Sequence, residues 1–163
     1  MDKTTFTEDL ENNRLIAVRT FKAPVEKVWQ AWSNADILCQ WWAPLPYICK
    51  IDSMDFKEGG FWIYNMIGPE GDIHRGRMDY LKITEFEKLQ AEDYFCDENG
   101  EKAGDIPPMQ LEVIFEEEGG TTRVTSTTTF ASPEAFKQMA EMGAAEGWEL
   151  ACNQLEELLE TLR

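Results

Sequence analysis

The chain has 163 residues, of which 43% are hydrophobic, and it carries a formal net charge of -16 at pH 7. A chain of this length can bury a sizeable core, so we expect residues 1–163 to form a single globular domain. The excess of acidic residues repels phosphate backbones and anionic lipid headgroups, which disfavours binding to nucleic acid or to a membrane surface.

The first thirteen residues, MDKTTFTEDLENN, are polar and acidic and contain no apolar run that could serve as a signal peptide. No later stretch approaches the apolar length of a membrane span. The four cysteines are far apart and lack CxxC spacing: Cys39, Cys49, Cys96 and Cys152. We therefore expect reduced thiols and a cytoplasmic location.

The regular pattern begins with one strand and two short helices. Residues 14–21, RLIAVRTF, are dense in apolar and β-branched residues, which predicts a strand. After Pro24 the apolar residues recur at helical spacing until Pro44, which predicts two short helices near residues 24–42.

Four tryptophans belong to these helices: Trp29, Trp32, Trp41 and Trp42. Large aromatic side chains at helical spacing usually supply core area, so we expect them mainly to hold the fold together. Trp29 is the one best placed to reach the mouth of a cavity as well.

From residue 47 to residue 130 the apolar pattern changes to a period of two. Six segments read as strands: YICKIDSMDF, GGFWIYNMI, IHRGRMDYLKI, KLQAEDYF, MQLEVIFEE and TTRVTSTTTF. Because turn-forming pieces separate most of them, they should be antiparallel neighbours in a meander. Ser132 and Pro133 then form the start of a long helix, near residues 133–161, with a possible bend at Gly143.

One strand, two short helices, six strands and one long helix make an α+β arrangement, in which a seven-stranded curved antiparallel sheet packs around the last helix. This order resembles the helix-grip fold of the START-like (SRPBCC) superfamily. Three stretches are similar to the family named for the activator of heat-shock protein 90 ATPase: RTFKAPVEKVWQAWSNADILCQWWAP, GGFWIYNMIGPEGDIHRGRMDYLKI and EMGAAEGWELACNQLEELLE. The resemblance implies a fold with an internal cavity and provides no shared catalytic set.

His74 is the only histidine, which excludes a histidine-rich metal site and any triad that needs a second histidine. No HExxH, CxxC, GxSxG, P-loop or GxGxxG motif is present, so we assign no metal, no cofactor and no catalytic residue. His74 shares strand parity with Met78 and Tyr80. It lies in the cavity if that face turns inward, and otherwise it is a histidine at the rim.

Strand parity and the resemblance together predict a cavity between the sheet and the long helix. Its expected ligand-binding residues are Trp29, Trp62, Tyr64, Met66, His74, Met78, Tyr80, Met109, Met139 and Gly143. Gly143 and Gly147 would each cost about 1 kcal/mol in the middle of a helix. Two explanations for these glycines are open. They either leave room for a ligand, or they allow close backbone packing or a kink.

The main hypothesis is a binding module that holds a small apolar or aromatic molecule. One alternative is an enzyme similar to the polyketide cyclases of the superfamily, with His74 and Tyr64 or Tyr80 as the acid–base group. Another is a protein-interaction module of the co-chaperone type. Contacts with a chaperone or with a second copy of the chain also stay open.

Overall fold

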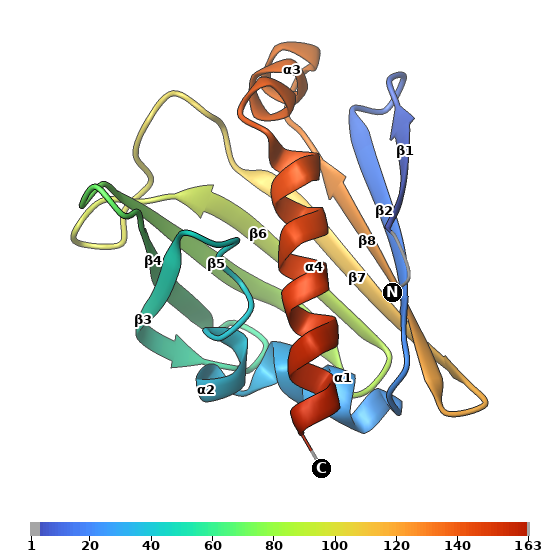
Figure 1. The fold of residues 1–163 in the computed structure, drawn as a ribbon. Coiled ribbons are helices and arrows are strands. Elements are labelled where there is room, and N and C mark those ends of the chain that lie inside the picture. The colour runs from blue at the N-terminus through green and yellow to red at the C-terminus, as the bar shows by residue number, and fades with distance from the viewer. Residues whose placement is uncertain (1–3, 163) are drawn as a thin grey trace.

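The computed structural model describes residues 4–162, which form one curved sheet with a long helix lying across it (Figure 1). The strands are β1 (Thr5–Asp9), β2 (Arg14–Phe21), β3 (Ile48–Asp55), β4 (Phe61–Ile67), β5 (Ile73–Thr84), β6 (Lys88–Phe95), β7 (Met109–Glu118) and β8 (Thr121–Thr129). The helices are α1 (Val25–Ser33), α2 (Ala35–Leu38), α3 (Pro133–Glu141) and α4 (Ala144–Thr161).

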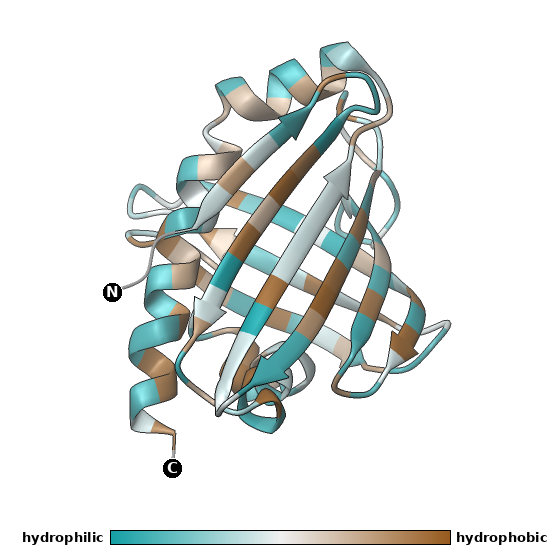
Figure 2. Cartoon of the chain, turned by 90° about the vertical axis from the view of Figure 1, so that its right-hand side faces the viewer, coloured by the Kyte–Doolittle hydropathy of each residue, from teal (hydrophilic) through white to brown (hydrophobic). Residues whose placement is uncertain are grey.

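All neighbouring strands are antiparallel, in the order β1-β2-β8-β7-β6-β5-β4-β3. The chain therefore runs as a meander from β3 to β8, as the short turns predicted, and β2 then pairs with β8. The α+β helix-grip architecture is confirmed. Figure 2 shows hydrophilic and hydrophobic residues alternating along several strands, as expected for a sheet with one covered face.

The predicted strand count of seven is wrong, because the acidic N-terminal segment adds an eighth strand. β1 pairs with β2, and Phe6 lies opposite Ala17. Asn13, in the turn between them, has a φ of 54°, a left-handed conformation that asparagine tolerates better than most residues. A single half-buried aromatic residue, Phe6, holds this polar edge strand on the core side.

The C-terminal helix is divided, where the sequence predicted one helix over 133–161. Ser132 caps α3, and its hydroxyl accepts a hydrogen bond from the backbone N–H of Ala135 at 3.1 Å. Gly143 then interrupts the helix with a φ of 82° and becomes the N-cap of α4. The bend that the glycine suggested is thus a complete break between two helices.

The tryptophans form a connected aromatic cluster at the place where α1, the segment after α2 and α4 meet. The rings of Trp32, Trp41, Trp42 and Trp148 lie 5.1–6.0 Å apart between centroids. Gln154 of α4 donates to the backbone oxygens of Trp41 and Ala43, at 3.1 and 2.9 Å. The expectation of a structural role therefore describes these residues well, and they anchor α4 to the helices that close one end of the sheet.

Within residues 4–162, no helix is both long enough and apolar enough to cross a lipid bilayer.

Candidate functional site

A cavity of about 150 Å³ lies between the sheet and the junction of α3 with α4. Its wall comes from β1, β2, β6, β7 and β8, from the segments that follow α2 and β8, and from both C-terminal helices. The lining residues are Phe6, Leu15, Ala17, Trp42, Asp93, Met109, Leu111, Ser126, Thr128, Phe130, Met139, Ala144 and Trp148. The space continues outward to solvent, so a small molecule has a route of entry.

The break at Gly143 shapes one side of this cavity. Phe130, just after β8, stacks on Phe136 of α3 with 4.6 Å between ring centroids, which fixes α3 over the end of the sheet. Met139 follows one turn later on the same helix and reaches the cavity wall. Because the chain turns at Gly143, Ala144 and Trp148 approach the cavity from a second direction.

Several lining side chains carry a polar group, among them Ser126, Trp42, Asp93 and Thr128. The Ser126 hydroxyl is buried and has no hydrogen-bond partner among the residues that the structure describes. The buried indole N–H of Trp42 has only the Tyr64 hydroxyl as a weak partner. An unsatisfied buried polar group costs about 1–3 kcal/mol, so each such group calls for an explanation. The Asp93 carboxyl accepts a long hydrogen bond of 3.4 Å from the Tyr64 hydroxyl.

Burial raises the pKa of the Asp93 carboxyl to about 7. The Tyr64 hydroxyl and the backbone N–H of Tyr94 favour the carboxylate, but the loss of solvent outweighs them. Burial likewise raises the pKa of the Tyr64 phenol well above its ordinary value. Asp93 is therefore the one group on the cavity wall that changes its charge near neutral pH.

Of the ten predicted site residues, Met109 and Met139 line the cavity. Trp62 and Tyr64 lie just behind its wall. Their rings stack on each other at 4.3 Å between centroids and meet the Trp42 ring at 5.2 and 5.9 Å. Tyr64 reaches the cavity only through its hydrogen bond to Asp93.

Four predicted site residues belong to the main core and do not line this cavity. Trp29 packs against Phe115 at 5.0 Å and against two further phenylalanines, so its expected reach to a cavity mouth is wrong. Met78 and Tyr80 are almost completely buried, and Met66 is partly buried against the same cluster. These side chains fill the interior that the sequence assigned to a ligand.

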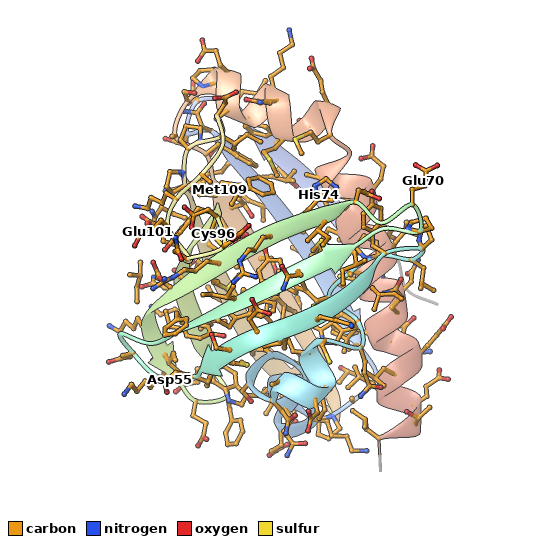
Figure 3. The ribbon with its side chains drawn as sticks, turned by 90° about the vertical axis from the view of Figure 1, so that its left-hand side faces the viewer. Asp55, Glu70, His74, Cys96, Glu101 and Met109 are labelled. Carbon is orange, nitrogen blue, oxygen red and sulfur yellow. The ribbon has the colours of Figure 1, made fainter. Side chains whose placement is uncertain are left out.

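His74 is exposed, so its predicted place in the cavity is wrong and the rim alternative holds. Half of its side chain is accessible (51%), and its Nε2 lies 3.1 Å from Asp72 Oδ2. Figure 3 shows His74 near the end of the sheet that carries Glu70, away from Asp55 at the opposite end. Strand parity predicted a buried His74, because His74 shares a face of β5 with Met78 and Tyr80. The first residues of β5 are exposed, however, since they extend beyond the part of the sheet that the core covers.

Gly143 does not leave room for a ligand in the way that the sequence suggested. A Cβ at this position would meet only the Glu146 carboxylate, at 3.7 Å. Its positive φ is the feature that requires glycine. The residue acts on the cavity indirectly, because it turns the chain so that Ala144 can line the wall.

Sequence reasoning missed Asp93, Ser126 and most of the cavity wall. For Asp93 a signal was present, because it shares strand parity with Leu89 and Ala91, which are both fully buried. Ser126 likewise follows Thr122 and Val124 on the covered face of β8. No comparable signal marks Phe6, since the strand that carries it was not predicted.

Within residues 4–162, no three His, Cys, Asp or Glu side chains lie close enough together to bind a metal ion. All four cysteines are free, and three of them are buried.

The curved sheet, the long helix and the cavity between them define a helix-grip domain of the START-like class. The family model described as "Activator of Hsp90 ATPase homolog 1-like protein" matches residues 22–160. The chain belongs to this family.

Solved structures support the same assignment. Protein Ms6760 from Mycobacterium smegmatis is 32% identical with a TM-score of 0.90, and the match covers 97% of each chain. A protein from Arthrobacter aurescens is 31% identical with a TM-score of 0.91, covering 96% of this chain and 91% of that one. A protein from Staphylococcus epidermidis is 32% identical with a TM-score of 0.85, covering 96% and 94%. No curated protein matches.

Proposed function

We propose that this chain is a binding protein for a small apolar molecule, which it holds in the cavity between the sheet and the α3–α4 junction. The observation that carries the proposal is an apolar cavity of about 150 Å³ whose wall includes the buried Ser126 hydroxyl, which has no hydrogen-bond partner within residues 4–162. An apolar cavity of about this size admits a benzene-sized molecule. The ligand is therefore one ring, or a short chain, that carries a hydrogen-bonding group.

The wall chemistry supports binding over catalysis. Within residues 4–162, Asp93 is the only titratable side chain that lines the cavity, so no second acid or base from this part of the chain faces it there. The cyclase alternative relied on His74, which lies outside the cavity. A cytoplasmic location remains part of the proposal, and the four free cysteines suit a reducing compartment. Contacts with a chaperone or with a second copy stay predictions.

The test fills the cavity without touching its polar groups. Ala144→Phe places a ring in the space, whereas Ala140→Phe adds the same ring to an exposed position of α3. Benzyl alcohol is titrated into each protein, and binding is followed by methyl NMR shifts and by tryptophan fluorescence.

We expect Ala144→Phe to weaken the binding of benzyl alcohol by about tenfold or more, which corresponds to about 1.4 kcal/mol. Ala140→Phe should bind as the unmodified protein does. Equal affinity in the two variants would place the binding site elsewhere, and saturable binding to neither variant nor the unmodified protein would end the proposal.

A further inference from the structure

Asp93 stands at a position of the sheet where an apolar residue is expected. Within β6, Leu89 and Ala91 point to the same face and are fully buried in the core. In the neighbouring strands Asp93 lies opposite Met78 and Met109. The desolvation of a carboxyl group among these side chains is unfavourable to the fold.

The fold itself does not neutralise this carboxyl group. None of the ion pairs formed within residues 4–162 includes Asp93. The one side chain that donates to it is the uncharged Tyr64 hydroxyl, at 3.4 Å. The buried carboxylate of Glu156 shows the contrasting case, because Arg19 lies 3.3 Å from it. Within residues 4–162 no cation pairs with the ionised Asp93 carboxylate, so a cationic ligand group would be its first charged partner.

The surroundings of Asp93 favour a cationic partner. Tyr64 donates a hydrogen bond to Asp93, and its ring centroid lies 5.9 Å from that of Trp42. The ring centroid of Trp148 lies a further 5.8 Å from that of Trp42. Aromatic faces attract ammonium groups, and methionine sulfur adds polarisable surface. The net charge of -16 also draws cations toward the protein and repels anions.

We infer that the ligand is an apolar amine, whose ring or short chain fills the cavity and whose ammonium group pairs with the Asp93 carboxylate. This inference rests on the proposed function, since it names the ligand class of the same cavity. Above the pKa of Asp93 a carboxylate ligand of the same shape is disfavoured, because it would bring a second negative charge to a site of low dielectric.

Three probes of one shape test the charge requirement in the unmodified protein. They are benzylamine, benzyl alcohol and benzoate, each titrated at about pH 8, where an alkylamine is protonated and the Asp93 carboxyl is ionised. We expect benzylamine to bind about tenfold or more tightly than benzyl alcohol, as is typical of a close buried charge pair. Benzoate should bind most weakly.

The advantage of benzylamine should depend on pH. It should be small at about pH 5.5, because the carboxyl then holds its proton, and should grow as the pH rises through its pKa of about 7. The groups that act on Asp93 are the Tyr64 hydroxyl from β4 and the Tyr94 backbone N–H from β6. Neither changes its charge in this range.

Two variants assign the effect to one carboxyl group. Asp93→Asn should reduce the advantage of benzylamine over benzyl alcohol to about twofold or less. Glu92→Gln is the matched control, because Glu92 precedes Asp93 on the same strand and contacts Gln110 and Lys102 instead. It should keep the full advantage. Circular dichroism confirms that both variants are folded.

The outcomes separate this inference from the proposed function. If benzyl alcohol binds and benzylamine has no advantage over it, the amine assignment is wrong and the cavity still binds a ligand. If none of the three probes binds, both proposals are wrong. The ranking and the pH profile need no variant, so the inference can fail even where Asp93→Asn does not fold.

Discussion

At the scale of single residues, Asp93 sets the pH dependence that we expect of the fold. Its pKa is raised from an ordinary value of 3.8 to about 7, because burial penalises the carboxylate. A raised pKa means that the folded state holds the proton more tightly than the unfolded state does. The stabilising contribution is therefore complete below about pH 4 and is lost as the pH rises through about 7.

Asp93→Asn should remove the loss of stability that accompanies ionisation of the Asp93 carboxyl. We expect the variant to be more stable than the unmodified protein at pH 8, by about 2 kcal/mol, and the difference to shrink toward pH 5. Urea unfolding at several pH values measures it. Glu92→Gln should not reproduce the effect, and parallel stability profiles for Asp93→Asn and the unmodified protein would show that the carboxyl is not desolvated.

At the scale of the secondary structure elements, the break between α3 and α4 depends on one backbone conformation. Gly143 has a φ of 82°, which side chains of L-residues rarely adopt, whereas Gly147 lies in the regular part of α4. Neither glycine is required by lack of space, since added Cβ atoms would meet their nearest neighbours at 3.7 Å in both cases. The two positions therefore separate the cost of conformation from the cost of packing.

Opposite effects should follow from the same substitution at the two sites. Gly143→Ala should lower the free energy of unfolding by about 1–2 kcal/mol, because alanine is strained in the left-handed region. Gly147→Ala should raise it by about 0.8 kcal/mol through helix propensity. Thermal melts should show Tm shifts of about 2–4 °C per kcal/mol. A higher Tm for Gly143→Ala would mean that α3 and α4 can join into one helix.

At the scale of the whole molecule, a buried arginine ties the sheet to α4. Arg19 of β2 donates to Asn153 at 2.9 Å and to Glu156 at 3.3 Å, and Glu149 lies 3.6 Å away. Arg19 is only 2% exposed, and Glu156 is 8% exposed. The ion pair is therefore part of the interface between the two layers of the fold.

Loss of one charge should cost more than loss of both. Arg19→Met leaves the Glu156 carboxylate buried without its main partner, and we expect a loss of about 3 kcal/mol in urea unfolding. The double variant with Glu156→Leu should recover most of that loss. The exposed pair of Arg123 with Glu116 provides the control, since Arg123→Met should cost less than about 1 kcal/mol. A double variant no more stable than the single one would contradict this account.

Periodicity found most elements because each is a local property of the chain. The strands from β2 to β8 and the helices α1 and α2 follow from apolar spacing and from the prolines and turns between them. β1 was missed because its segment is polar, with only Phe6 turned to the interior. The break at Gly143 was anticipated as a bend, but its extent depends on how α3 docks through Phe136 onto Phe130.

The sequence by itself determined the α+β class, the antiparallel meander and the structural role of the tryptophans. Of its predicted ligand-binding residues, Met109 and Met139 line the cavity. The tertiary structure decided which other side chains meet at the cavity. Parity says which face of a strand a residue occupies, but not whether a ligand, a core side chain or solvent lies beyond it. The curvature of the sheet and the path of α4 decide how deeply each point of that face is covered. Met78 therefore lies in the core, His74 lies at the exposed rim, and Asp93 lines the cavity.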